Sequence, residues 1–206
     1  MKRIFLLLLL TVAAFPAAAQ YAFSPELLER LVTAYRAGDP RAVKAVERVA
    51  AASEEFLAME PMSVTAKTQL PPSNDKRDYM SLPPYWWPDP SKPDGLPYIR
   101  RDGERNPEVY DCPERENGDK LGYAARTLGV LYRVTGDERY AAKCAELLRT
   151  WFLDPQLGMN PNMTYAQLIR GRTAIRGTGI IDARRMCFAL NAASLIGDSP
   201  AWSDRD

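Results

Sequence analysis

The strongest constraint on the fold is a long proline-rich stretch in the middle of the chain. Residues 60–118 hold 11 of the 17 prolines in the 206-residue sequence, and neither helical nor strand periodicity continues through them. Loops of this length are uncommon inside compact domains and are usually functional or disordered. Disordered segments are poor in aromatic residues, whereas this one holds Tyr79, Tyr85, Trp86, Trp87, Tyr98 and Tyr110. We therefore predict an ordered, proline-stiffened loop that lays aromatic rings across a surface.

Amphipathic patterns flank this stretch on both sides. Capping residues followed by proline predict two helices over residues 24–38 and 39–59, joined by a short link as an antiparallel hairpin. Three more helices are predicted over residues 119–135, 137–154 and 180–196, and no alternating run is long enough to predict a strand. The predicted fold class is all-α: an incomplete (α/α) toroid of antiparallel helix hairpins that carries the long loop. A five-helix bundle is the alternative.

The charge balance and the missing histidine exclude several function classes. The sequence has no histidine, which rules out Ser-His-Asp and Cys-His nucleophile systems, HExxH zinc sites and a histidine general base. Its 27 Lys and Arg nearly balance 26 Asp and Glu, which argues against nucleic acid as a partner. Cys112, Cys144 and Cys187 form no CxxC motif, so we expect no metal or redox site. Their odd count and the helical patterns around two of them predict no structural disulfide, and we expect no cofactor. We expect Cys144 and Cys187 to be buried small hydrophobes.

The first residues are predicted to be a secretory signal peptide. Lys2 and Arg3 precede an apolar stretch over residues 4–15, and small residues then offer a cleavage site after Ala19. The apolar stretch is short for a transmembrane helix, and no later stretch could span a membrane. We expect a mature domain over residues 20–206 that is periplasmic or secreted.

Two loop clusters hold the candidate binding residues. Residues 73–89 combine aromatic rings with Lys, Arg and Asp, a combination that suits sugars, and arginine can bind a carboxylate through two parallel hydrogen bonds. Residues 160–179 combine amide, phenol and guanidinium groups with glycines. The candidate substrate-binding residues are Lys76, Arg77, Tyr79, Tyr85, Trp86, Trp87, Asn160, Asn162, Tyr165, Gln167, Arg172 and Arg176. Alternatively, the tryptophans plug the core and the arginines are solvated surface. A third cluster, residues 94–103, is expected to form turns.

The sequence resembles the alginate lyase family of helical-toroid polysaccharide lyases. The resemblance rests first on Pro72-Ser-Asn-Asp-Lys-Arg-Asp-Tyr-Met-Ser-Leu-Pro-Pro-Tyr-Trp-Trp-Pro-Asp89 and its continuation to Gly103. It extends through residues 135–143, 147–155 and 160–167 to Gly177-Thr-Gly-Ile-Ile-Asp182. The family block usually has a histidine where this sequence has Arg77.

The resemblance implies cleavage of an acidic, uronate-containing glycan of the alginate or glucuronan type by β-elimination. A group neutralises the C6 carboxylate, a base removes the C5 proton and an acid protonates the leaving oxygen. The family's Asn-Asn-His segment and its catalytic Arg and Tyr belong to a C-terminal half that this sequence lacks. We therefore expect an N-terminal portion, apparently truncated at the C-terminus, without detectable activity alone. Within the chain, the catalytic candidates are Arg77, Tyr79 and Tyr165.

Two other functions stay open at this point. One is a non-catalytic remnant that binds acidic glycans. The other is a toroid glycoside hydrolase, which would need paired carboxylates, drawn for instance from Asp75, Asp78 and Asp89.

Overall fold

The computed structural model describes residues 24–203 and 206, so the predicted signal peptide lies outside the described residues. The predicted all-α class is confirmed: six α-helices and one two-stranded ribbon form the described part. In chain order the elements are α1 (Pro25–Arg36), α2 (Pro40–Ala52), α3 (Glu54–Leu57), β1 (Trp86–Trp87), β2 (Ile99–Arg100), η1 (Pro107–Asp111), α4 (Glu114–Thr135), α5 (Glu138–Leu148), η2 (Arg149–Leu153), η3 (Gly177–Gly179) and α6 (Ile180–Leu195).

Helices α1 and α2 form the predicted hairpin. Ser24 Oγ accepts a hydrogen bond from the Leu27 N–H, and Asp39 Oδ1 accepts from two N–H groups of the first turn of α2, so both caps act as their residue types require. The second helix was predicted to run unbroken to residue 59, but it ends at Ala52. Ser53 Oγ donates to the carbonyl of Val49, and such a local side-chain bond competes with continued helix.

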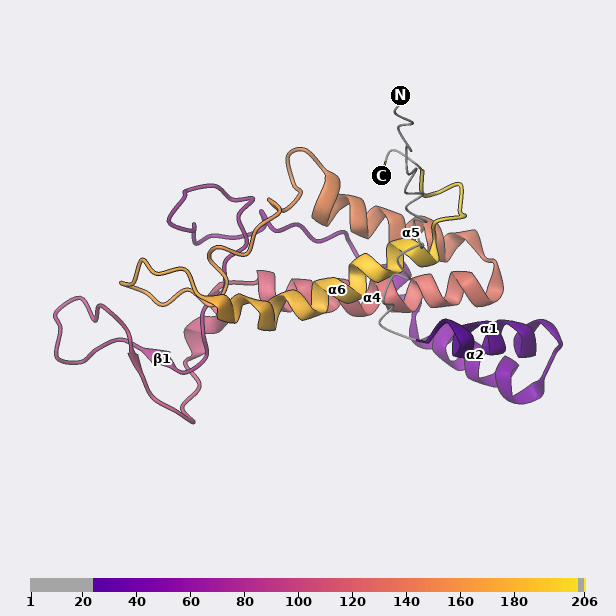
Figure 1. Cartoon of the computed structure of the whole chain (residues 1–206), viewed down its shortest axis with the longest axis horizontal. Coiled ribbons are helices and arrows are strands. Elements are labelled where there is room, and N and C mark those ends of the chain that lie inside the picture. Colours follow the sequence, from indigo (N-terminus) through magenta and orange to yellow (C-terminus); the bar gives the residue numbers. More distant parts are fainter. Residues whose placement is uncertain (1–23, 204–205) are drawn as a thin grey trace, which may run out of the picture.

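Helices α4, α5 and α6 lie side by side along the long axis of the molecule, with α4 in contact with both others (Figure 1). The α4 and α6 backbones approach closely at Gly122, where a Cβ atom would lie 2.5 Å from the carbonyl oxygen of Arg185. Leu121, Leu128 and Trp151 are among the large side chains that fill the core around α4. This layer gives the loops a rigid support.

The start of α4 differs from the prediction. The helix begins at Glu114 instead of Asp119, because a tertiary contact extends it by more than a turn. The Glu114 carboxylate is buried and lies 2.6 Å from the ammonium group of Lys67, which also donates to the carbonyl of Asp78. Gly118 is a residue that disfavours helix locally, but here it packs against core side chains of η2 and α6. A buried ion pair therefore ties the long loop to α4.

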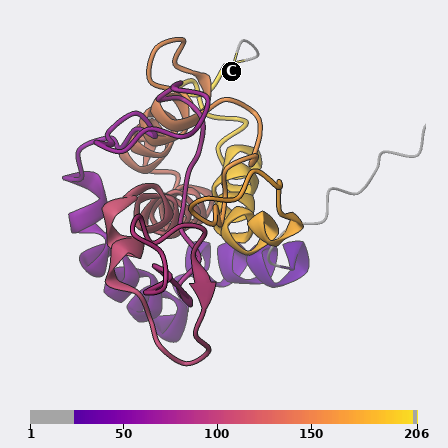
Figure 2. The same cartoon turned by 90° about the vertical axis from the view of Figure 1, so that its left-hand side faces the viewer.

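The long loop and residues 156–179 gather at one end of the helical layer, opposite α1 and α2 (Figure 1), and they face the viewer together in Figure 2. Within the long loop, β1 and β2 pair antiparallel, with Trp86 opposite Arg100 and Trp87 opposite Ile99. The sequence predicted no strand, because two-residue strands carry no detectable alternation. Turns form at both ends of residues 94–103 as predicted, with positive φ angles at Gly95 and Gly103, but β2 lies between them.

The three cysteines are free thiols. Cys112 and Cys144 are buried, and burial raises the pKa of each thiol to about 12. Cys187 was predicted to be buried but is exposed, because it lies on the outer side of α6. Among the described residues, no helix combines the length and the apolar character needed to cross a membrane.

Candidate functional site

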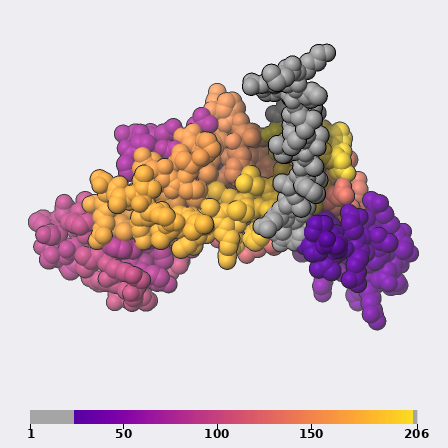
Figure 3. All heavy atoms as spheres, viewed as in Figure 1, coloured from indigo at the N-terminus to yellow at the C-terminus, as the bar shows by residue number. Residues whose placement is uncertain are grey.

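A hollow of about 330 Å³ opens where the long loop meets residues 156–179. The long loop contributes Tyr85, Trp86 and Arg100, and the later loop contributes Gln167, Arg176 and Thr178. The first turns of α4 and α6 close it with Arg115 and Ile181. The hollow thus combines residues from both clusters predicted from the sequence, at the end of the molecule where these segments lie beside each other in Figure 3.

Arginine side chains surround the Trp86 ring. The guanidinium carbon of Arg172 lies 4.8 Å from the ring centroid and that of Arg176 lies 5.7 Å from it. Arg176 also donates a 3.0 Å hydrogen bond to the backbone carbonyl of Gln167, which fixes its position. Within residues 24–203 and 206, neither arginine has a carboxylate at ion-pair distance. The tryptophan face and two uncompensated cations therefore form one surface.

The positive charge of the hollow contributes to a lowered pKa of Arg176. Partial burial, together with the nearby charges of Arg172 and Arg100, lowers its pKa. Arg100 is paired with Asp102, but both side chains are exposed, so water screens that pair strongly. Arginine stays protonated at neutral pH in spite of such shifts. An anion in the hollow would relieve the repulsion among these cations.

Asp182 holds the walls of the hollow together from below. This buried carboxylate on α6 accepts hydrogen bonds from the hydroxyls of Ser81 and Tyr79, the latter at 3.2 Å. Its other oxygen accepts from Gln167 Nε2 at 2.9 Å and lies 3.8 Å from Arg115 Nε. One carboxylate thus joins α6, the long loop, the later loop and α4.

Two polar atoms at the hollow have no partner among the described residues. These are Arg115 Nη1 and Thr178 Oγ1, and both are buried. Buried donors and acceptors in proteins are almost always satisfied by protein, water or ligand. They mark positions where a bound molecule could form hydrogen bonds.

A second group of predicted residues forms a link between the loops. Asn160 Nδ2 donates to Asp75 at 3.0 Å and to Asp78 at 2.8 Å, and Asn162 Nδ2 donates to Asp78 at 3.0 Å. Arg77 Nε donates to the carbonyl of Gly158 at 2.8 Å. Burial would raise the pKa of Asp78, but the hydrogen bonds from Asn160, Ser73 and Asn162 outweigh it and lower the pKa. The predicted binding amides therefore hold the two loops together.

Tyr79 does not lie in the hollow. Its exposed fraction is 0%, and its hydroxyl donates to Asp182 in the core. Burial, and next the Asp182 carboxylate, raise the pKa of Tyr79 far above its ordinary value. The structure gives no support to the prediction that Tyr79 binds substrate or serves as a base, because a base needs a lowered pKa and an exposed oxygen. Its aromatic spacing in the sequence could not distinguish core from surface.

The remaining predicted residues have different environments. Tyr165 is half-buried against Met80 and pairs with it through a backbone bridge. Gln167 is buried and lines the hollow. Trp87 is half-buried and donates through Nε1 to the carbonyl of Glu104 at 2.8 Å. Lys76 is exposed.

Sequence reasoning missed four residues of this region: Arg100, Arg115, Thr178 and Asp182. Arg100 lay in the segment assigned only to turns, and Arg115 was assigned to the loop because α4 was predicted to begin later. Asp182 was noted only within a motif block. The available signal was at Asp182, an acidic residue in the first turn of a predicted helix that follows two isoleucines. An acid among apolar residues is buried only when it has partners.

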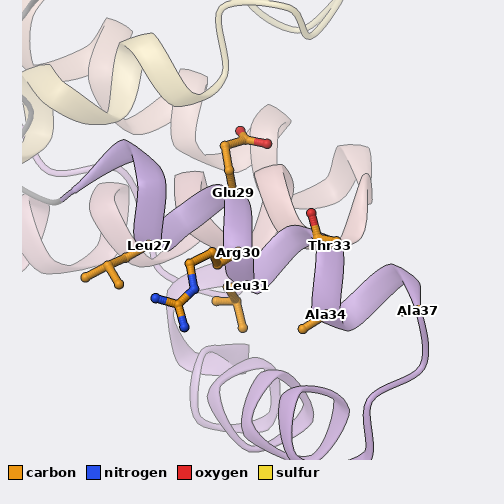
Figure 4. Close-up of a pocket in the computed structure, with 7 residues that line it drawn as sticks. All are labelled: Leu27, Glu29, Arg30, Leu31, Thr33, Ala34 and Ala37. Carbon is orange, nitrogen blue, oxygen red and sulfur yellow. The ribbon is translucent and has the colours of Figure 1, made fainter.

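A larger hollow, about 620 Å³, lies along α1 and is lined by Leu27, Glu29, Arg30, Leu31, Thr33, Ala34 and Ala37. In Figure 4 these side chains spread around the helix without converging on one point. No residue of either predicted cluster lies there, so we do not assign it a site. Within the described residues, no group of three His, Cys, Asp or Glu side chains is placed to hold a metal ion.

The fold and the site define an all-α protein with an arginine- and tryptophan-lined hollow between two long loops. The family model "Alginate lyase" matches residues 63–206, and the chain belongs to the alginate lyase family. One similar solved structure is an alginate lyase from Bacteroides ovatus, with 42% identity and a TM-score of 0.79. The match covers 90% of this chain and 48% of that chain, so this chain spans about half the length of that relative. No curated protein matches the chain.

Proposed function

We propose that the chain binds an acidic, uronate-containing polysaccharide of the alginate or glucuronan type and contributes to its cleavage by β-elimination. The observation that carries the proposal is the hollow in which Arg172 and Arg176 lie over the Trp86 ring without carboxylate partners in the described structure. Membership of the alginate lyase family supports the same reaction class.

The chemistry of each group supports this assignment. A pyranose presents a C–H face that packs on an aromatic ring, and a uronate adds a carboxylate that an arginine fork binds in two places. Neutralising the C6 carboxylate makes the C5 proton more acidic, and preorganised cations do this best in a partly desolvated site. Arg176 and Arg172 are assigned this role, and Trp86 the role of a sugar platform. The unpaired Arg115 Nη1 and Thr178 Oγ1 are donors for the sugar's oxygens.

The hydrolase alternative finds less support. A glycoside hydrolase needs two carboxylates on opposite sides of the scissile bond. The hollow is lined by no Asp or Glu among the described residues. Asp75 and Asp78 accept hydrogen bonds from Asn160, and Asp89 accepts from the backbone and hydroxyl of Ser91 in a turn. These three acids therefore have structural roles, and the cationic hollow favours an anionic substrate.

The alternative that the chain binds acidic glycans without cleaving them is one outcome of the test below. The buried Tyr79 is unsuited to act as a base, so the described residues favour binding and charge neutralisation more than proton transfer.

We also propose that the protein acts in the periplasm or after secretion, on the basis of the charged and apolar pattern of residues 1–19.

Titration calorimetry with a uronate oligosaccharide tests the proposal. Arg176→Gln should weaken binding about tenfold to a hundredfold, because a charge-assisted hydrogen bond contributes about 1.5–3 kcal/mol. Trp86→Ala should also weaken it, while Arg48→Gln, an exposed arginine on α2, should not. Equal affinity in all four proteins would refute the site. With polymer, products that absorb as unsaturated uronates indicate elimination, and new reducing ends without that absorbance indicate hydrolysis.

A further inference from the structure

A second set of arginine and aromatic side chains lies along α4 and α6, beyond the hollow. On α4, Arg115, Asp119, Tyr123 and Arg126 follow one another at intervals of four, four and three residues, so they occupy one face of the helix. From Arg115 to Arg126 this face extends about 17 Å, at about 1.5 Å per residue.

The facing side of α6 carries complementary residues. The guanidinium carbon of Arg185 lies 5.0 Å from the Tyr123 ring centroid, and that of Arg126 lies 5.5 Å from the same centroid. Arg126 also lies 4.7 Å from the ring centroid of Phe188. We call Arg115, Tyr123, Arg126, Arg185 and Phe188 the α4–α6 track. It repeats the arrangement at Trp86, in which two arginines approach one aromatic ring.

The track is continuous with the hollow. A neighbouring hollow of about 260 Å³ is lined by Asp119, Ile180, Asp182, Arg184 and Arg185, and it shares Arg115 and Ile181 with the hollow at Trp86. The two hollows therefore meet at the first turns of α4 and α6. In Figure 3 the surface of α6 continues directly from the loop residues 156–179 along the molecule.

The charges of the track are only partly compensated. Asp119 Oδ1 lies 3.5 Å from Arg185 Nε and Asp182 Oδ1 lies 3.8 Å from Arg115 Nε, which offsets two cations. Arg126 has no carboxylate at ion-pair distance among residues 24–203 and 206, and Tyr123 is 44% exposed. An accessible ring beside an unpaired guanidinium matches a sugar that carries a carboxylate.

We propose that the α4–α6 track binds further uronate units of the same glycan chain, so that the site recognises a polymer and not a single sugar. The proposal rests on the proposed function of the Trp86 hollow. It predicts that affinity rises with chain length until the oligomer spans both the hollow and the track.

Calorimetry with a uronate disaccharide and with an oligomer longer than about 17 Å tests this. Tyr123→Ala combined with Arg126→Gln should weaken the long oligomer about tenfold and leave disaccharide affinity unchanged. The matched control is Tyr110→Ala with Arg105→Gln, a stack with the guanidinium 5.3 Å from the ring centroid that lines neither hollow. Unchanged melting temperatures exclude unfolding as the cause.

The outcomes separate the two proposals. The proposal for the α4–α6 track would be overturned if the track variant bound the long oligomer as tightly as the parent. It would also be overturned if the variant lost affinity equally for the disaccharide and the oligomer. If Trp86→Ala and Arg176→Gln leave disaccharide affinity unchanged, the proposed sugar site in the Trp86 hollow is refuted, whatever the track variant does.

Discussion

Replacing Asp182 by asparagine should loosen the connection between the helices and both loops. The substitution keeps the size of the side chain and removes its charge. Asp182 is 6% exposed, and its two oxygens receive Ser81, Tyr79 and Gln167 as hydrogen-bond donors with Arg115 close by. An asparagine can turn its amide nitrogen toward the two hydroxyls, which can rotate to accept. All three hydrogen bonds then survive, but with an uncharged side chain, and Arg115 loses its carboxylate partner.

The magnitude follows from that count. A hydrogen bond to a charged group contributes about 1.5–3 kcal/mol and a neutral one about 0.5–1.5 kcal/mol. Each of the three hydrogen bonds to Asp182 should therefore weaken by about 1 kcal/mol, for a total loss of about 3 kcal/mol. This agrees with the 3–5 kcal/mol typical for the loss of one partner in a buried charge network.

Urea unfolding followed by tryptophan fluorescence measures the effect. Asp102→Asn is the matched control, because the exposed pair of Asp102 with Arg100 should contribute less than about 1 kcal/mol. A loss below about 1 kcal/mol for Asp182→Asn, equal to that of the control, would refute the role assigned to this carboxylate.

Three further predictions concern packing, pH and thiol reactivity. Gly122→Ala should destabilise the fold by about 1–3 kcal/mol in thermal unfolding, because its Cβ would lie 2.5 Å from a carbonyl oxygen of α6, whereas Gly118→Ala, whose Cβ would meet atoms no closer than 3.7 Å, should be tolerated. The pKa of Asp78 is lowered in the folded state, so its contribution to stability is present above its unfolded pKa of about 3.9 and is lost as the pH falls through the folded value. Asp78→Asn should therefore lose less stability than the parent protein when the pH is lowered from neutral to about 3. Cys187 alone should react with a thiol reagent in the native protein, with the two buried thiols reacting only after unfolding, and a second fast equivalent would contradict the structure.

Helix positions were predictable where local signals agree with packing. The caps of α1 and α2 act through their own side chains, and Gly136 ends α4 with a positive φ angle, so these boundaries followed from the sequence. The start of α4 did not, because it depends on the ion pair of Glu114 with Lys67, two residues far apart in the chain. Contacts of this kind leave no periodic pattern.

The candidate site was predictable as a set of residue types but not as an arrangement. Trp86, Arg172 and Arg176 were identified because aromatic and guanidinium groups suit a uronate, and the fold brings them together. Asn160 and Asn162 were assigned to the substrate by the same chemistry, yet they bind Asp78. An amide suits a sugar and a carboxylate equally well, and only the folded loops distinguish the two partners.

The most direct test of the central claim compares two ligands that differ at one group. Calorimetry with a β-1,4-glucuronate oligomer and with a cello-oligosaccharide of equal length isolates the C6 carboxylate, because the sugars and linkages otherwise match. If the arginines over Trp86 bind that carboxylate, the uronate should bind at least about tenfold more tightly, and Arg176→Gln should reduce the difference. Equal affinity for the two oligomers, or a preference for the neutral one, would contradict the account.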